Sequence, residues 1–263
     1  MPVEARYFTD PACPWSWAIE PELQRLRWEF GDAVRIRPVM GGLARTYEPE
    51  DHAALVIEWL EAAERSRMPV DPLLWRRNPL SSTYPACQAV KAAAEQGDAA
   101  GMRYLRRLRE GILCERRRLD HAEALIAEAG EAGLDVERFE IDLRSHAIVE
   151  AFAADLEEVR SGEETRMPTL LFGGEDGERQ AVQGPNAYGA FREAAIASGA
   201  SPSRDDRPEP AEAIERFGRL ATRELEGLTG KPRPVLEAEL WSAARDWRLR
   251  PDTGPFGTFW SLP

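Results

Sequence analysis

The chain has 263 residues, 43% of them hydrophobic, and a formal net charge of −12. This length suits one large domain or a domain with an appendage, and the acidic balance disfavours a general role in binding nucleic acids or anionic membranes. No apolar run reaches the length of a membrane span, no N-terminal secretory signal is visible, and three cysteines are too few for a disulfide framework. We therefore expect a soluble, cytoplasmic protein.

The first forty residues predict a strand, a helix and a second strand. Residues 5–10 suit a short strand, and 16–30 repeat apolar side chains near helical spacing until Gly31 ends the pattern. Residues 33–39 alternate apolar and basic side chains, as a strand does. Cys13 therefore falls at the first junction between a strand and a helix.

A long helical section follows, after which the sheet resumes. Helices are expected at 50–67, 84–97, 100–118, 121–133 and 146–162. Residues 167–174 and 179–184 predict a strand and its hairpin partner, and 186–199 a closing helix. This order predicts an α/β domain over 1–199, in which a helical insertion at about 45–162 separates the two halves of a small sheet.

The last part of the chain predicts a separate small unit. Residues 200–212 are polar and proline-rich, which is typical of a linker. Residues 213–263 predict helices, a turn at Gly230 and strand-like ends, an order that fits a small helical, winged-helix-like appendage. Five aromatic residues offer it a core or a packing surface: Trp241, Trp247, Phe256, Phe259 and Trp260. Because the candidate recognition helix at 234–247 is acidic, we expect packing and not DNA binding.

A run of arginines lies in the middle of the chain. Its members are Arg103, Arg106, Arg107, Arg109, Arg116, Arg117 and Arg118. The stretch that follows, 121–165, is strongly acidic. The simplest interpretation is that both are solvated helix faces, and the alternative is that the arginines form a basic patch for an acidic partner.

The position of Cys13 predicts a reactive thiol. Unpaired N–H groups and the helix dipole stabilise a thiolate at a helix N-terminus, where its pKa can fall from about 8.5 to roughly 3.5–7.5. Pro14 suits a first helical turn, and Trp15 and Trp17 can shield the site. Ser16 can donate a hydrogen bond to the sulfur but cannot form a disulfide, so a single thiol permits mixed disulfides only.

A second feature is the sequence RMPTLLF at 166–172. Pro168, at the start of a strand, stands where a cis proline that faces Cys13 would lie. Proline occurs at strand starts for other reasons, so this signal is weak by itself. It gains specificity from the strand–cysteine–helix unit near the start of the chain.

These motifs together resemble the DsbA-type thioredoxin-like family, and within it the FrnE-like and YjbH-type (Spx adaptor-like) proteins. The matching pieces are FTDPACPWSW, SSTYPACQAVKAAAEQG, GLDVERFEID and RMPTLLFGG. The resemblance implies a thioredoxin fold with a helical insertion and, as in YjbH-type proteins, a C-terminal extension. It also implies a catalytic pair, Cys13 and Ser16, and a substrate-binding set made of Pro14, Trp15, Met167, Pro168 and Thr169.

Three functions follow from this resemblance. The first is a thiol–disulfide oxidoreductase or monothiol reductase that acts on protein thiols or disulfides through Cys13, although most redox-active relatives have cysteine where Ser16 stands. The second is a non-redox adaptor that delivers a client to a cytosolic protease and binds an extended client peptide. The third is a kappa-class glutathione transferase or hydroxychromene carboxylate isomerase, a class that uses serine at the first site position. No bound cofactor is expected, and glutathione or an analogue could serve as co-substrate.

The remaining cysteines and histidines predict little chemistry. Cys87 and Cys114 suit buried helix positions, with Cys87 as an alternative resolving thiol. The three histidines, His52, His121 and His146, lack metal-ligand spacing, so no metal site is expected. The deciding observation is whether the Cys13 sulfur is accessible: an open sulfur favours thiol chemistry or peptide capture, and a covered one favours an adaptor or a structural role.

Overall fold

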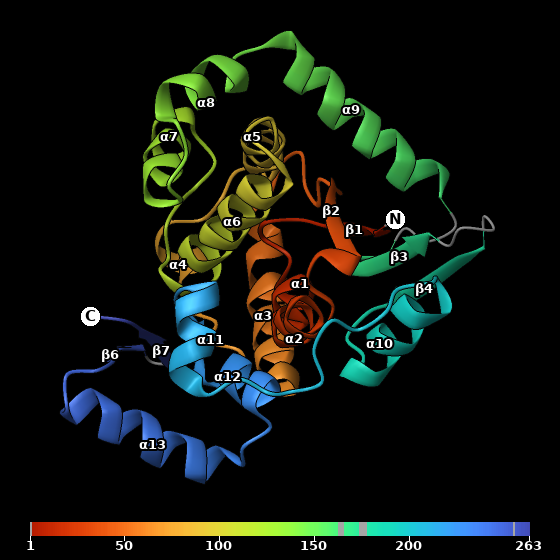
Figure 1. Cartoon of the computed structure of the whole chain (residues 1–263). Coiled ribbons are helices and arrows are strands. Elements are labelled where there is room, and N and C mark those ends of the chain that lie inside the picture. The colour runs from red at the N-terminus through yellow and green to blue at the C-terminus, as the bar shows by residue number, and fades with distance from the viewer. Residues whose placement is uncertain (1, 163–165, 174–177, 255) are drawn as a thin grey trace.

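A four-stranded mixed sheet forms the centre of the N-terminal body in this computed structural model, which describes residues 2–162, 166–173, 178–254 and 256–263 (Figure 1). The strand order is β2-β1-β3-β4, with β1 and β2 parallel and β3 antiparallel to its two neighbours. The strands are β1 (Val3–Thr9), β2 (Val34–Met40), β3 (Thr169–Gly173) and β4 (Arg179–Gln183). Gly174, at the end of the expected third strand, lies outside the described residues.

The helix predicted at 16–30 is wrong as a single element, because the structure divides it in two. A short helix α1 (Pro14–Ala18) ends at Ile19, and α2 (Glu20–Phe30) begins immediately after it. Pro21 explains the break, since it has no N–H to donate to the preceding turn and its ring would clash there. The closing helix of the body, α10 (Tyr188–Ala197), packs against α2 and β4.

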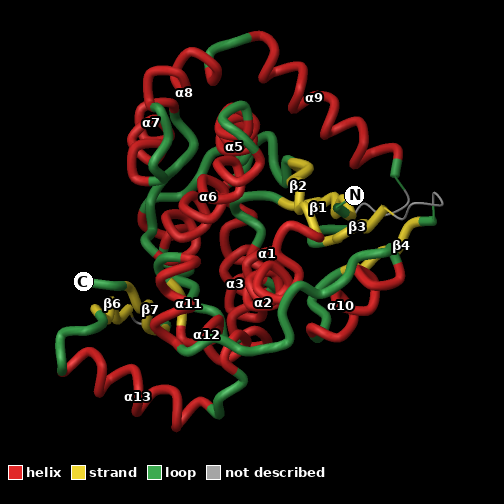
Figure 2. Tube along the Cα trace, viewed as in Figure 1, coloured by secondary structure: helices red, strands yellow, loops and turns green. Residues whose placement is uncertain are grey.

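The helical insertion connects β2 to β3 and contains the longest helices of the body. Its helices are α3 (His52–Ser66), α4 (Leu74–Arg77), α5 (Tyr84–Ala94), α6 (Asp98–Arg109), α7 (Ala122–Glu131), α8 (Val136–Leu143) and α9 (His146–Ser161), with a 3₁₀ turn η2 (Pro49–Asp51) before α3 and a π-helical turn η3 (Glu110–Cys114) after α6. A further 3₁₀ turn, η1 (Gly31–Ala33), precedes β2. Helix α5 packs against α6, α8 and α9, while α3 packs against α1. Figure 2 shows this helical layer beside the sheet.

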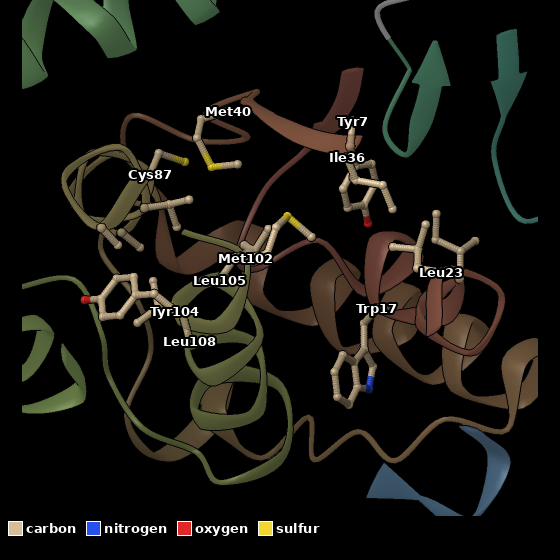
Figure 3. Packing of buried hydrophobic residues seen from close by; sticks show 14 of the residues in the cluster. Tyr7, Trp17, Leu23, Ile36, Met40, Cys87, Met102, Tyr104, Leu105 and Leu108 are labelled. Carbon is tan, nitrogen blue, oxygen red and sulfur yellow. The ribbon is translucent and has the colours of Figure 1, made fainter. Parts of the chain in front are cut away.

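One hydrophobic core joins the sheet, α1, α2 and the insertion. Tyr7 of β1, Trp17 of α1 and Leu23 of α2 are fully buried, and Figure 3 shows them in the same core as Met40 and Cys87. The alternation of apolar and basic residues in β2 turns Ile36 inward, as the sequence pattern predicts. The thioredoxin-like fold expected from the sequence is therefore confirmed.

The C-terminal residues form a second unit below the body in Figure 1. Its elements are α11 (Pro210–Phe217), β5 (Leu220–Ala221), α12 (Thr222–Thr229), α13 (Arg233–Arg245), β6 (Arg250–Gly254) and β7 (Gly257–Ser261), and its strands pair in the order β5-β7-β6. Helix α11 begins inside the stretch expected to be linker, because Pro210 suits the first turn of a helix. Trp28 of α2 packs into the apolar core of this unit and donates to the Asp206 carbonyl at 2.9 Å.

Buried ion pairs join the appendage to the body. Arg106 of α6 donates to both carboxylate oxygens of Glu224, at 2.6 and 2.9 Å, and Glu224 is fully buried. Arg219 of the appendage reaches Glu110 at 2.8 Å, and Arg223 reaches Glu22 at 3.0 Å. The appendage is therefore held in a defined position against α2 and α6.

The five aromatic residues of the appendage were expected to form a core or a surface that packs on the body, and two of them, Phe259 and Trp260, do so. Phe259 and Trp260 are buried, and Phe259 lies 6.4 Å from the Trp17 ring. Trp247 is 87% exposed, because it follows the end of α13 in a left-handed conformation that turns it away from the body. Trp241 and Phe256 are also exposed. Within the described ranges, no helix is both long and apolar enough to cross a membrane.

Candidate functional site

Cys13 lies at the junction between β1 and α1, where the sequence predicts it. It is the N-cap residue of α1, with extended backbone angles, and Pro14 is the first helical residue. The Ser16 amide donates a hydrogen bond to the Cys13 sulfur at 3.3 Å. The cysteine side chain thus replaces the oxygen that usually caps a helix N-terminus.

The Cys13 sulfur is covered, which overturns the prediction of a lowered pKa. The residue is only 3% exposed, and burial raises the pKa of its thiol from 9.0 to about 11. Hydrogen bonding from Ser16 opposes this shift but is weaker than the loss of hydration, and the carboxyl of Asp10 adds to the rise. Near neutral pH the thiol is therefore protonated.

Ser16 contributes its backbone and not its hydroxyl to the site. Its side chain is fully buried, and within the described residues the hydroxyl oxygen has no hydrogen-bond partner. Its carbonyl accepts from the Tyr7 hydroxyl at 3.1 Å. The expected hydrogen bond to sulfur comes from the Ser16 amide.

A buried carboxyl beside Cys13 was not singled out by the sequence analysis. Asp10 is fully buried at the end of β1; one oxygen accepts from the Ala12 amide at 2.8 Å and the other from the Leu43 amide at 2.9 Å. The thiol of Cys87 also donates to Asp10, at 3.3 Å. Burial raises the pKa of Asp10 although these hydrogen bonds lower it, and burial likewise raises the pKa of Cys87. Asp10 thus ties the Cys13 loop to the loop after β2.

The expectation that Cys87 is buried is correct, whereas Cys114 is only half-buried. Cys87 is packed inside α5 with no exposed surface. Cys114 ends the π-helical turn, where its thiol donates to the Pro69 carbonyl at 3.1 Å. The three cysteines are free thiols.

A second polar group lies behind α1. Arg109 is fully buried; it donates to Glu20 at 2.9 Å and to the Tyr7 hydroxyl at 3.1 Å, and it also bonds the Thr9 hydroxyl. The Tyr7 hydroxyl in turn donates to the Ser16 carbonyl, so these hydrogen bonds fix the orientation of α1 from the core side. The arginine comes from α6, so the insertion helps to position the site.

The peptide bond between Met167 and Pro168 is cis, as predicted. Phe8 pairs with Thr169 across β1 and β3, so Pro168 lies next to Thr9 at the end of the sheet from which the Cys13 loop emerges. Pro168 and Thr169 are buried, while Met167 is half-buried.

Two glycines after β2 make room for this arrangement. Gly41 lies so close to the Met167 side chain that a Cβ there would collide with its sulfur. Gly42 has a positive φ of 58° and meets the side chains of Tyr84 and Phe152. The sequence pair Gly41–Gly42 was an available signal for this close approach.

A groove opens beside α1, between the loop after β2 and helix α3. It has a volume of about 600 Å³ and is lined by Leu43, Tyr47, Leu55 and Glu58, among others; we call it the Leu43 groove. Trp15 is half-buried and donates from its indole N–H to Glu58 at 3.1 Å. Leu43 is 43% exposed. An apolar side chain of a partner could therefore enter next to Trp15.

Metal chemistry finds no support in this part of the fold. No group of three or more histidine, cysteine, aspartate or glutamate side chains is arranged to hold a metal ion among the described residues. Asp10 is instead occupied by two backbone amides and a thiol. The geometry offers a covered, protonated thiol and, beside the neighbouring Trp15, a groove that is lined by both apolar and charged residues.

The fold and this cis-proline site are those of a thioredoxin-family protein. A family model described as Thioredoxin matches residues 7–193, and the chain belongs to this family. Among solved structures, the cytosolic disulfide reductase DsbM from Pseudomonas aeruginosa has a TM-score of 0.62 and 21% identity, over 74% of this chain and 98% of that chain. This likeness shows the shared fold.

The curated relatives are adaptors by name. The ClpXP adapter protein SpxH of Halalkalibacterium halodurans is 31% identical over 195 residues, which cover 71% of this chain and 64%, just under two thirds, of the relative. SpxH of Bacillus subtilis is 28% identical over 270 residues, which cover 98% of this chain and 89% of the relative. The match to the second protein therefore extends through the C-terminal appendage. The resemblance to DsbA-type proteins and YjbH-type adaptors is confirmed.

Proposed function

We propose that this chain is a protein-binding adaptor that presents a client to the ClpXP protease. The observation that carries the proposal is the covered Cys13 thiol, which is 3% exposed and has its pKa raised to about 11. A nucleophile of disulfide exchange must be a reachable thiolate, and this one is neither reachable nor ionised near neutral pH. Two further facts support a role in binding. Ser16 stands where a second thiol would be needed, and SpxH of Bacillus subtilis, named as a ClpXP adapter, matches 98% of the chain.

The client surface in this proposal is the end of the sheet around Cys13. It combines Trp15, Met167 and Pro168 with the Leu43 groove. Exposed apolar side chains such as Leu43 lose their hydration on binding, which favours association. An extended client segment could pair with the backbone beside Pro168, the mode of recognition expected from the sequence. An adaptor of this kind works in the cytoplasm with its protease.

A degradation assay tests the proposal. Purified ClpXP and a Spx protein as probe client are incubated with and without the chain, and the loss of client is followed on gels. We expect the chain to accelerate degradation, Cys13→Ser to retain this effect, and Leu43→Glu to lose most of it. Leu262→Glu is the matched control, since Leu262 is also 43% exposed but lies at the C-terminus. No acceleration, or equal loss in both leucine variants, contradicts the proposal.

A monothiol reaction through Cys13 is the second candidate. The observation in its favour is the hydrogen bond from the Ser16 amide to the sulfur at the start of α1, which would stabilise a thiolate once the site opened. Mass spectrometry after incubation with oxidised glutathione measures the mixed disulfide at Cys13. Rapid modification of the native chain, together with loss of function in Cys13→Ser, would favour this candidate over the adaptor.

A further inference from the structure

The arginine run of the sequence separates into two sets in the structure. Arg106, Arg107 and Arg109 of α6 turn inward and form ion pairs with buried glutamates. These arginines are therefore neither a solvated face nor an open basic patch, contrary to both interpretations of the sequence. Arg103, one turn earlier on α6, remains exposed.

Arg103 lines a groove on the side of the molecule where α2, β2 and α6 meet the appendage. The groove has a volume of about 650 Å³, and its lining includes Arg27 of α2, Arg35 of β2 and Arg216 of α11. Arg216, Phe217 and Gly218 of the appendage form part of its lining. We call it the Arg103 groove.

The Arg103 groove carries positive charge that the chain itself leaves unbalanced. Five arginines and two aspartates line it. Asp98 is shared by Arg35 and Arg37, at 3.7 and 3.4 Å, and Arg106 is paired with Glu224. Across the described ranges of the chain, Arg27, Arg103 and Arg216 have no carboxylate at ion-pair distance. Arg216 donates to the Arg27 carbonyl at 3.3 Å, and its guanidinium lies 5.1 Å from the centroid of the Trp28 ring and 5.5 Å from that of Phe217.

The state of Arg27 shows that this charge is also poorly hydrated. Arg27 is half-buried, and burial, with a contribution from Arg106, lowers the pKa of its guanidinium although Glu20 opposes the shift. A desolvated cation without a partner is costly, and an arriving carboxylate would remove that cost with charge-assisted hydrogen bonds. The chain as a whole carries a net charge of −12, so this positive groove is a local exception.

The apolar residues that line the Arg103 groove favour an anion that also carries apolar groups. Val34, Ile36 and Met102 line the groove but are buried, while the half-buried Phe217 and the exposed Ala99 give its walls apolar surface. A free phosphate would leave these apolar walls in contact with water, and a nucleic acid would be repelled by the acidic remainder of the chain. A peptide that carries both carboxylates and apolar side chains satisfies both kinds of wall.

We propose that the Arg103 groove binds an acidic segment of a partner protein, with its carboxylates on Arg27, Arg103 and Arg216 and its apolar side chains against Phe217 and Ala99. This groove lies between α2, α6 and the appendage, apart from the Leu43 groove that we assign to the client. The proposal does not depend on the adaptor function, because it follows from charge and shape alone.

Fluorescence anisotropy with a labelled peptide of alternating Glu and Leu residues tests this inference. We expect the intact chain to bind the peptide and the affinity to fall as salt rises, because ionic contacts are screened. A peptide in which each Glu is replaced by Gln should bind at least about tenfold more weakly, a difference that reports loss of charge-assisted contacts. Equal binding of the two peptides would overturn the proposal.

Matched variants locate the binding. Arg103→Glu, alone and combined with Arg216→Glu, should lower the affinity for the Glu–Leu peptide at least about tenfold, because a positive charge is replaced by a negative one. Arg160→Glu is the control, since Arg160 is an exposed helical arginine on α9, and no residue of α9 lines this groove. Arg103 is exposed, so its single variant keeps the test valid if the double variant unfolds. Unchanged binding in Arg103→Glu, or full displacement of the peptide by inorganic phosphate, would overturn the proposal.

Discussion

The Cys13 site and the interface between body and appendage both bury polar groups, but they satisfy them differently. At the interface, Arg106 meets Glu224, Glu110 and Glu20, and these carboxylates raise the pKa of Arg106 although burial acts to lower it. At the site, Asp10 and Cys13 receive hydrogen bonds mainly from backbone amides and have raised pKa values. Opposite charges favour the ionised forms at the interface, although burial still raises the pKa of Glu224 against the opposing effect of Arg106, whereas the scarcity of such charges makes the site favour its neutral forms.

This difference assigns separate tasks to the two regions. An ionised, paired cluster fixes two units of structure in one orientation, because either charge alone would be buried without compensation. A neutral, covered thiol is chemically quiet, which suits a surface used for binding. Five predictions test this comparison, and the largest effect belongs to the interface.

Removing the central charge of the interface should cost the most stability. Arg106→Ala leaves Glu224 buried without its partner, and we expect a loss of about 3–5 kcal/mol in the free energy of unfolding. Urea denaturation followed by circular dichroism measures it. Arg103→Ala is the control on the same helix and should change stability by less than about 0.5 kcal/mol, since that side chain is exposed. Similar stabilities for the two variants would show that the ion pair does not hold the units together.

The Cys13 thiol should react about a hundredfold more slowly at neutral pH than an ordinary thiol, because a pKa near 11 in place of 9.0 reduces the thiolate fraction to that extent. Rates of alkylation by iodoacetamide against pH, mapped by mass spectrometry, measure this. The urea-unfolded chain is the control, in which all three thiols should titrate near their ordinary values. A pKa below about 8.5 for Cys13 in the native chain would contradict this prediction and support the reactive thiolate expected from the sequence.

The same shift gives a pH dependence of stability. The pKa of Cys13 is higher in the folded chain than in the unfolded chain. Below about pH 9 the thiol is protonated in both states, so its ionisation does not change the free energy of unfolding. As the pH rises toward 11, only the unfolded thiol ionises freely, and stability falls. Cys13→Ala should flatten this part of the profile, measured by urea unfolding between neutral and alkaline pH.

Asp10→Asn should destabilise the chain moderately, by about 1–3 kcal/mol. The amide can still accept one hydrogen bond, but the nitrogen that replaces an oxygen cannot accept from the Leu43 amide or the Cys87 thiol. Thermal unfolding measures the change. Asp32→Asn, at an exposed position, should be nearly neutral. If both variants are equally stable, the hydrogen bonds of Asp10 do not stabilise the fold.

The smallest expected effect is a gain of activity in Ser16→Cys. A second thiol one helical turn from Cys13 can resolve a mixed disulfide, so we expect weak insulin reduction where the natural chain has none. Equal activity in the two proteins would mean that another thiol already resolves the intermediate. If neither the natural chain nor Ser16→Cys reduces insulin, burial of the Cys13 sulfur prevents the reaction, as expected for an adaptor.

The sequence by itself determined most of the secondary structure and the location of the site. Periodicity and the positions of glycine and proline are local signals, and they were sufficient for β1, β2, α3, α5 and α9. The cis Pro168 was predicted only in combination with the strand–cysteine–helix unit near the start of the chain. The divided helix at Ile19 was missed because the apolar period continues through it, although Pro21 was visible. Cys13 was likewise placed correctly at its junction, since strand, cysteine and proline are adjacent in the chain.

Only the tertiary structure decided whether Cys13 is a thiolate, where the arginines point and how the appendage docks. Burial of the sulfur depends on β2, α3 and the loop at Gly41, which are distant in sequence. Arg106 and Glu224 are far apart along the chain, and nothing local indicates that they meet. A local pattern predicts a helix N-terminus, but the pKa of its thiol depends on how much water the rest of the fold excludes, and that is a property of packing.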